Sequence, residues 1–525
     1  MIEKITLENF KGIGKETTIR LAPLTLLFGG NSSGKSTILH ALAYVREIFE
    51  SHACDVKGTT LGGDSIDLGG FKEIVHGHDT QKTIRMRFDF DNNGKKGWVQ
   101  IVVGIPSEIG IPQGDHLPWV LSYQTGFDGK PFAELGYCPP TAENPEHKAC
   151  LRKLDIDHPV IEENKEIIET FLAPSNLSDH CDEETPSGIT NLVKNFAQRF
   201  TLPLPDALPL LMANPLFTSD AGGEAHVAAS ALNSFIQGPA LELRRLLADM
   251  VYLGPIREIP ARKFELSARI ANLAREHCGN YVSRGAKGLG AYHMLPILEK
   301  EEWDRINADL SETDNQYLDT GYELVYLPDD CEVTKDGRLA SLKSKYFPPQ
   351  FIEYIKSLTP VKLQQFKQSF PKDKWFGLFD IKRKTLVQMY SVGLGLSQVI
   401  PLTVCMARHK NGTLLFEQPE LHLHPKQQAA VGDLLIRAVK QSRSHIIAET
   451  HSVHLILRIL RRIRETQNEE NVIAEFTQDD LSVQYVDFES GRTTFTEMEV
   501  GNDGLFLTDW PDSFFEQEFM ERFGL

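Results

Sequence analysis

The sequence predicts an α/β fold in which an N-terminal and a C-terminal half of the chain build one P-loop head, with a large, mostly helical insertion between them and a small C-terminal β-hairpin cap. An apolar strand, a glycine-rich loop and a helical pattern follow one another within residues 24–45. Short apolar strands and amphipathic helices return only at residues 413–464, and the residues between carry no phosphate-site motif. The two halves therefore have to meet in space to complete one site.

The first of these patterns predicts a phosphate-binding loop. Residues 24–37 read LTLLFGGNSSGKST, in which Gly29, Gly34, Lys35 and Ser36 satisfy G-x-x-x-x-G-K-[ST]. Glycines let backbone N–H groups surround a β-phosphate, the helix N-terminus adds positive potential, Lys35 reaches the β/γ-phosphates, and the Ser36 hydroxyl binds Mg²⁺. The other loop residues that complete the cradle are Asn31, Ser32, Ser33 and Thr37. A strand before the loop and a helix after it predict a nucleoside triphosphate site.

Five segments are expected along the chain. They are the N-terminal half of the head (1–104), an inserted helical segment (105–250), a central helical segment rich in basic and aromatic residues (251–380), the C-terminal half of the head (381–470), and C-terminal strands with a cap (471–525). Asp91-Asn92-Asn93-Gly94 and Glu489-Ser490-Gly491 each predict the turn of a β-hairpin. Val251–Pro260 predicts a short strand that re-enters the core, with Arg257 near a turn.

Composition excludes several classes of protein. The net charge of −17 argues against a chain that coats nucleic acid through bulk electrostatics. No run of eighteen apolar residues occurs, so no membrane partner is expected, and the N-terminus reads as an opening strand. The seven cysteines are scattered without C-x-x-C pairs. We therefore expect a cytoplasmic protein with neither a zinc site nor a disulfide framework.

One region departs from the acidic average. Residues 335–384 contain twelve Lys/Arg against four Asp/Glu, with aromatic residues between them. Basic residues alternating with aromatics are what a surface for single-stranded nucleic acid requires. The interpretation we favour is a solvated helical face whose aromatics belong to the core. DNA or RNA stays open as a partner.

The C-terminal half carries three further motifs in a fixed order. They read YSVGLGLSQVI (390–400), LLFEQPELHLHP (414–425) and IIAETHS (446–452). Following the phosphate loop, they resemble the signature, Walker B/D-loop and switch-histidine segments of ABC-type ATPases of the SMC, RecF and overcoming-lysogenisation kind, which are AAA-family ATPases. The closest resemblance is to the PtuA-like ATPases of bacterial anti-phage defence. It covers about residues 1–104 and 380–470.

This resemblance implies a role for particular residues. Glu417 takes the Walker B position and holds Mg²⁺ together with Ser36, and His451 takes the switch position near the γ-phosphate or the attacking water. The signature loop, which would clamp the γ-phosphate of a nucleotide on a second subunit, falls on Gly393, Gly395 and Gln398. The implied cofactors are ATP and Mg²⁺, held between two copies in a homodimer or a higher homo-oligomer.

Two positions depart from the family pattern. Gly393 stands where the family has its signature serine, with Ser391 and Ser397 nearby, which leaves a hydroxyl contact to the γ-phosphate open. Gln418 stands where the family has its catalytic glutamate, and an amide can orient water but cannot act as a general base. Either Glu420 or His451 substitutes as the base, or hydrolysis is slow and the nucleotide mainly stabilises an assembly. We expect slow turnover.

The resemblance also implies a process. It suggests a sensor or scaffold subunit of an anti-phage complex that regulates a separate nuclease, because Asp479-Asp480 and Asp509 do not supply the carboxylate pattern of a nuclease domain in this chain. The alternative is a DNA-repair or DNA-binding ATPase of the RecF or SMC type without a nuclease partner.

Overall fold

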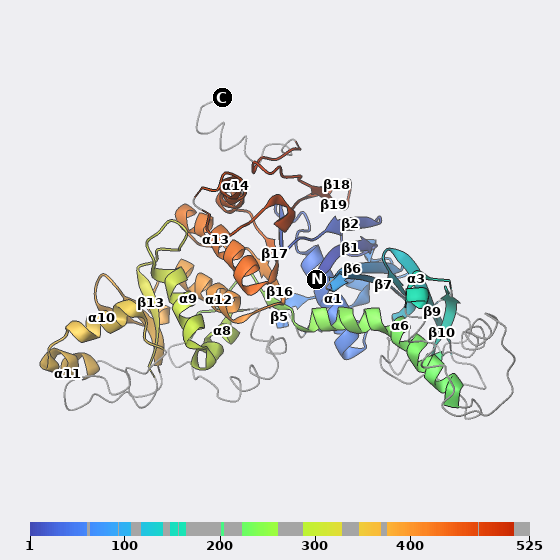
Figure 1. Ribbon diagram of the computed structural model, residues 1–525, viewed down its shortest axis with the longest axis horizontal. Helices are drawn as coiled ribbons and strands as arrows, with labels where there is room; N and C mark the ends of the chain where they lie inside the picture. Colours follow the sequence, from blue (N-terminus) through green and yellow to red (C-terminus); the bar gives the residue numbers. More distant parts are fainter. Residues whose placement is uncertain are drawn as a thin grey trace.

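The computed structural model describes most of the chain. The described residues are 1–59, 63–92, 94–106, 117–139, 148–155, 157–163, 201–203, 223–260, 287–327, 346–368, 375–470 and 472–508. Figure 1 shows the central strands β16 and β17 between two extensions, one carrying β13, α10 and α11 and the other carrying β9, β10 and α6.

A six-stranded sheet joins the two ends of the chain. Its order is β12 (Val251–Leu253), β16 (Thr413–Glu417), β17 (His445–Glu449), β3 (Leu24–Gly29), β18 (Leu481–Glu489) and β19 (Arg492–Glu497). All neighbours are parallel except β18 and β19. The expected union of the two halves is thus confirmed, and so is the strand that re-enters the core at 251.

Both faces of this sheet are buried, which explains its continuous apolar runs. On one face, Leu27, Leu415 and Ile447 pack in a cluster with helix α1 (Thr37–Ser51). On the other, alternate residues such as Leu26 and Phe416 pack in a cluster with three helices. These helices are α12 (Leu394–Arg408), α13 (Pro425–Ser442) and α14 (Val453–Gln467).

A second, antiparallel sheet begins in the N-terminal half. Its order is β11 (Thr201–Pro203), β10 (Lys148–Leu154), β9 (Lys130–Cys138), β8 (Trp119–Phe127), β7 (Lys95–Gly104), β6 (Ile84–Asn92), β1 (Ile2–Glu8) and β2 (Thr17–Arg20). The hairpin expected around 91–94 is confirmed as β6 and β7. Helix α6 (Gly223–Ala248) contributes Ile236, Ala240 and Leu243 to the core under this sheet.

The expectation of a mostly helical segment at 105–250 is wrong for its first described part. Strands β8, β9 and β10 extend the sheet there, and β8 and β9 are joined by Asp128 and Gly129, both with positive φ. An Asp-Gly pair between strands favours such a two-residue turn. The amphipathic patterns at 161–172 and 189–200 lie outside the described residues, apart from helix α3 (Pro159–Glu163).

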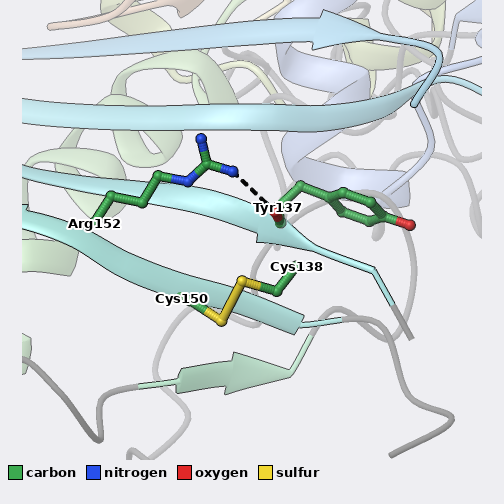
Figure 2. The surroundings of a disulfide bond; sticks show 4 residues. All are labelled: Tyr137, Cys138, Cys150 and Arg152. Atoms are coloured by element: carbon green, nitrogen blue, oxygen red, sulfur yellow. Dashed lines mark hydrogen bonds between the residues drawn. A yellow bond between two sulfur atoms is a disulfide. The ribbon is translucent and has the colours of Figure 1, made fainter. Parts of the chain in front are cut away.

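A disulfide corrects the expectation drawn from the cysteines. Cys138 on β9 and Cys150 on β10 are bonded, with their Cα atoms 6.2 Å apart. In the register of the two strands Cys138 lies opposite Lys148, so the cysteines are diagonal neighbours. Figure 2 shows the bond next to Arg152, whose Nη2 donates to the Tyr137 carbonyl at 3.1 Å. The spacing of the cysteines in the sequence did not reveal this pair, because the two residues become neighbours only through the register of β9 and β10.

The central segment is mixed rather than helical. It contains α8 (Leu289–Met294), α9 (Lys300–Ser311), α10 (Pro349–Ser357), α11 (Pro360–Gln368) and an antiparallel sheet of β13 (Tyr322–Leu327), β14 (Trp375–Asp380) and β15 (Thr385–Val387). Phe347, Phe351 and Phe379 are buried in one cluster, and Tyr354 stacks on Phe379 at 5.4 Å. These aromatics are core residues, as the favoured interpretation held.

Smaller elements complete the fold. They are β4 (Gly58–Thr59), β5 (Gly63–Asp67), α2 (Phe71–Ile74) and the 3₁₀ turns η1 (His76–His78), η2 (Leu295–Ile297), η3 (Met389–Ser391) and η4 (Gln478–Asp480). The C-terminal hairpin is present, but β18 pairs with β3 and is a strand of the head rather than a separate cap. Across the described ranges, no helix is both long and apolar enough to cross a membrane.

Candidate nucleotide-binding site

The loop between β3 and α1 can only be built with glycine at two positions. Gly29 has φ of +151°, and a Cβ there would lie 2.0 Å from the Val486 carbonyl oxygen. Gly34 has φ of +98°, and a Cβ there would lie 2.4 Å from Oγ1 of Thr493. Side chains would therefore push the loop away from β18 and β19. Asn31 and Ser32 are exposed at its tip, as loop residues that meet a ligand must be.

The start of α1 offers an anion the backbone N–H groups of its first turn other than that of Thr37, which donates to the Gly34 carbonyl at 3.0 Å. Its N-cap is Ser36, whose side chain caps no backbone group, and its first turn contains no acidic residue. Thr37 is its first, buried residue, and Ser33 is buried just before it. Free N–H groups at the N-terminus of a helix favour phosphate.

Lys35 is held at this loop by its own carbonyls. It is 4% exposed, and its Nζ donates to the carbonyl oxygens of Gly30 at 2.6 Å and Gly29 at 3.3 Å. Burial lowers the pKa of Lys35, while Glu449 and Glu417 act to raise it. The cation therefore lies within electrostatic reach of both carboxylates.

Two carboxylates lie at the carboxyl ends of adjacent strands. Glu417 ends β16 and Glu449 ends β17, and the two are paired in register. The Ser36 hydroxyl donates to Oε2 of Glu449 at 2.6 Å, and the Tyr252 hydroxyl donates to Oε1 of Glu417 at 2.6 Å. The phosphate loop and the Walker B strand, far apart in the chain, therefore meet at one edge of the sheet. Glu449 was not anticipated as a site residue, although it lies within the predicted switch segment 446–452.

Burial raises the pKa of the Glu417 carboxyl from 4.5 to about 7. The hydrogen bond from Tyr252 acts to lower this pKa, and the negative charge of Glu449 acts to raise it further. A carboxyl with a raised pKa in the folded state makes the free energy of unfolding fall as pH rises from about 4.5 to about 7. Above that range the full penalty of the buried charge remains.

We therefore expect Glu417→Gln to stabilise the protein at alkaline pH. In EDTA at pH 8 its free energy of unfolding should exceed that of the wild type by about 1–3 kcal/mol, because the amide accepts the Tyr252 hydrogen bond without a buried charge. The difference should shrink toward zero near pH 5. Thermal unfolding monitored by circular dichroism at both pH values measures it, and a variant less stable than the wild type at pH 8 would contradict the expectation.

A second lysine lies beside the same carboxylate. Nζ of Lys11 is 2.5 Å from Nδ1 of His40, whose Nε2 is 4.0 Å from Oε1 of Glu417. Burial lowers the pKa of Lys11 to about 8, against the opposing charge of Glu417. Burial, with Lys11 adding to it, lowers the pKa of His40 to about 3, so the imidazole is neutral. Neither residue was expected at the site.

His451 lies next to the phosphate loop, as the switch position requires. Burial lowers its pKa, the nearby Lys35 lowers it further, and a hydrogen bond with the backbone of Gly29 acts in the opposite direction. Its backbone N–H donates to Oε1 of Glu420 at 2.9 Å, and the same oxygen accepts from Oγ1 of Thr450 at 2.7 Å. Glu420, which is 5% exposed, thus positions the His451 loop through Oε1, while its Oε2 is buried without a hydrogen-bond partner.

Gln418 adopts a backbone conformation that is rare for a residue with a side chain. Its φ is +44°, its N–H donates to the Glu449 carbonyl at 2.8 Å, and its own carbonyl accepts from Nη2 of Arg257 at 3.3 Å. Non-glycine residues held at positive φ concentrate at functional sites. The backbone contacts hold Gln418 directly after Glu417.

Arg257 is a supporting residue of the site whose role the sequence did not reveal. It follows the bend at 255–256, near the expected turn, and is 2% exposed. Its Nη1 donates to the Gln398 carbonyl at 3.0 Å, and its Nη2 donates to the Glu417 carbonyl at 3.0 Å. It thereby ties α12 to the end of β16. Its only signal in the sequence is an arginine inside a short apolar strand segment.

The signature residues divide into two groups. The amide of Gln398 is buried and bonded on both sides to the Arg257 backbone, at 3.1 Å and 2.7 Å, so the side chain is not directed at a partner's phosphate. Gly395 is required by packing, since a Cβ there would lie 2.7 Å from the His422 carbonyl oxygen. Gly393, in contrast, is the exposed N-cap of α12 with open space around its Cα. Only Gly393 of the three has the expected outward position.

The signature glycines do not line the phosphate loop of their own chain. Gly393 and Gly395 line a separate hollow with Leu318, Thr320 and Gln427. Within one chain the structure brings together the phosphate loop, Glu417 and His451. Arg257 links α12 to the end of β16, while the glycines at the start of α12 line the separate hollow.

The C-terminal hairpin supplies one further unexpected contact. Oγ1 of Thr493, on β19, donates to the Ser33 carbonyl at 3.0 Å, and its backbone N–H donates to the Gly12 carbonyl at 2.9 Å. The hairpin thus fixes the phosphate loop from the side opposite α1.

The donor set fits ATP with Mg²⁺. Loop N–H groups and Lys35 suit phosphates, while a hydroxyl and two carboxylates suit a hard cation that takes oxygen ligands. Among the described residues no group of three or more His, Cys, Asp or Glu could hold a metal alone. Mg²⁺ usually binds one or two carboxylates and completes its shell with phosphates and water.

Three solved structures resemble the chain. The SMC head bound to the C-winged helix domain of ScpA is 14% identical, with 95% of this chain and 97% of that chain covered and a TM-score of 0.36. The SMC head domain from Thermotoga maritima is 10% identical, with 95% and 99% covered and a TM-score of 0.35. The SMC head domain with an extended coiled coil bound to the C-terminal domain of ScpA, derived from Pyrococcus furiosus, is 12% identical, with 95% and 96% covered and a TM-score of 0.34. A likeness at this level says nothing of a shared assembly.

The sequence comparison is more specific. No curated protein matches the chain. The family described as the AAA ATPase domain matches residues 1–196 and 270–456, in two blocks on either side of an insertion. These blocks contain the phosphate loop, Glu417 and His451. Because the match covers well over half of the 525 residues, the chain belongs to the AAA ATPase domain family, a membership that implies ATP binding and ATPase activity.

Proposed function

We propose that this protein is an ABC-class ATPase switch in which two copies close head to head on two Mg²⁺·ATP. The observation that carries the proposal is the division of the site. The phosphate loop, Glu417 and His451 lie together, while Gly393, the exposed N-cap of α12, has open space around its Cα and lines a separate hollow. A second copy would bring that free helix terminus to the γ-phosphate. Nucleotide binding would then favour the closed dimer.

Slow hydrolysis is part of the proposal. Gln418 cannot accept a proton, and Glu420 is committed to Thr450 and the His451 backbone. Of the bases expected from the sequence, His451 remains; it lies next to the phosphate loop, and its pKa is lowered. A long-lived ATP-bound dimer suits a sensor or scaffold better than a motor.

Gly393 provides the test. In Gly393→Glu, a carboxylate in open space should leave the monomer folded but repel a partner's γ-phosphate, so that the ATP-dependent dimer is lost while ATP affinity changes by less than about threefold. Light scattering after size exclusion, with and without Mg²⁺·ATP, measures it. Gly393→Ala is the matched control and should still dimerise, because its Cβ meets nothing within 4 Å. A wild type that stays monomeric with ATP, or that releases several phosphates per second, would overturn the proposal.

We further propose that the switch acts on a separate nuclease in a bacterial anti-phage system. The support is the motif order and the PtuA-like segments, and the described residues add no carboxylate cluster that could serve as a nuclease centre. Copurification of a nuclease subunit with the protein expressed from its native operon tests this. ATP-dependent binding to DNA ends, weakening with salt, would instead favour a DNA-repair role. The net charge of −17 and the buried aromatics of the central segment count against that alternative.

A further inference from the structure

Glu449 occupies the centre of the carboxyl-end edge of the main sheet. Strand β17 lies between β3, which leads into the phosphate loop, and β16, which ends at Glu417. In register, Glu449 is opposite Glu417 on one side and Leu27, two residues before Gly29, on the other. Neither the expected Walker residues nor the signature segment includes it.

The contacts of Glu449 point to the cation side of the site. It is 6% exposed, and its Oε2 accepts the Ser36 hydroxyl at 2.6 Å. That hydroxyl is the one that a phosphate loop uses to bind Mg²⁺. Because the Ser36 hydroxyl donates its hydrogen bond to Glu449, the Ser36 side chain does not cap α1. The backbone carbonyl of Glu449 also receives the Gln418 N–H at 2.8 Å, so the two residues are fixed to each other.

We propose that Glu449 is the second carboxylate of the Mg²⁺ site, beside Glu417 and Ser36, and that it supplies the negative charge missing at Gln418. The inference rests on the proposed Mg²⁺·ATP site. Gln418 places an amide directly after Glu417 at the end of β16, and Glu449 places a carboxylate at the end of the neighbouring strand. Two buried carboxylates next to a phosphate site repel the nucleotide unless a divalent cation lies between them.

This arrangement predicts an unusually strict dependence on Mg²⁺. A fluorescent ATP analogue is titrated into the purified protein in EDTA and then at increasing Mg²⁺. Glu449→Gln should need at least about tenfold more Mg²⁺ for half-saturation, because one ligand charge is lost. In EDTA it should bind the analogue as well as the wild type or better, because a repulsive charge is gone. The exposed Glu73→Gln is the matched carboxylate-to-amide control and should change neither value.

A second pair of variants tests the exchange itself. Gln418→Glu in the Glu449→Gln background should restore most of the Mg²⁺ affinity. Bound Mn²⁺, counted by electron paramagnetic resonance with the ATP analogue present, gives a readout independent of hydrolysis. Glu449→Asp keeps the charge and stands in if the amide variant fails to fold.

The outcomes separate the alternatives. An unchanged Mg²⁺ midpoint with slower phosphate release would make Glu449 a base and overturn the proposal. An unchanged midpoint with only a lower melting temperature would make it structural and also overturn it. A wild type that binds no analogue at any Mg²⁺ concentration would instead remove the proposed function on which the inference rests.

Discussion

Lys35→Ala should abolish nucleotide binding under ordinary conditions while leaving the fold intact. We expect the affinity for Mg²⁺·ATP to fall at least ~100-fold, about 2.8 kcal/mol, because a charge-assisted contact to the phosphates is lost. The buried amine is bonded only to the carbonyls of its own loop among the hydrogen bonds described for its side chain. Removing it takes away a desolvated charge, so the melting temperature should change little.

Isothermal titration calorimetry with a non-hydrolysable ATP analogue measures the loss. Lys15→Ala is the matched control, since Lys15 is exposed in the same N-terminal segment and should bind normally. A Lys35→Ala protein that binds within about fivefold of the wild type would mean that the loop does not hold the triphosphate.

The parallel sheet could be predicted because its strands are buried on both faces. Runs such as Leu24–Phe28 and Thr413–Phe416 are apolar apart from one threonine each, and a motif residue that identifies the strand follows each run. The order of the motifs along the chain then predicted that the N-terminal and C-terminal halves form one nucleotide-binding site. The antiparallel strands β8 and β9 were harder to predict, since glycines and polar residues interrupt their alternation and a proline-rich, acidic context surrounds them.

The supporting contacts of the site could not be predicted because they join positions remote in the chain. Arg257 and Glu417 are 160 residues apart, Ser36 and Glu449 are 413 apart, and Thr493 lies 460 residues from Ser33. No local periodicity encodes such pairs. Each becomes visible only when strand register is known, as with Glu449 opposite Glu417.

Arg257→Met should be the most destabilising substitution near the site. Arg257 is buried and donates to the backbone carbonyls of Gln398, Glu417 and Gln418. Methionine fills much of the volume but leaves these acceptors without the guanidinium donors, which should lower the free energy of unfolding by about 3–5 kcal/mol. Burial lowers the pKa of Arg257 to about 10, so the guanidinium is still charged at neutral pH.

Denaturant unfolding monitored by tryptophan fluorescence measures the effect. Arg245→Met is the control, because Arg245 is hydrogen-bonded to Glu242 but its side chain is 59% exposed, and its loss should lower the free energy of unfolding by less than about 1 kcal/mol. Arg257→Lys keeps the charge but cannot reach α12 and β16 at once, so it should fall between the two. Since the same guanidinium holds the carbonyls of Glu417 and Gln418, the lysine variant should also bind Mg²⁺·ATP more weakly. Equal stability of Arg257→Met and Arg245→Met would show that the link between the signature helix and the Walker B strand is dispensable.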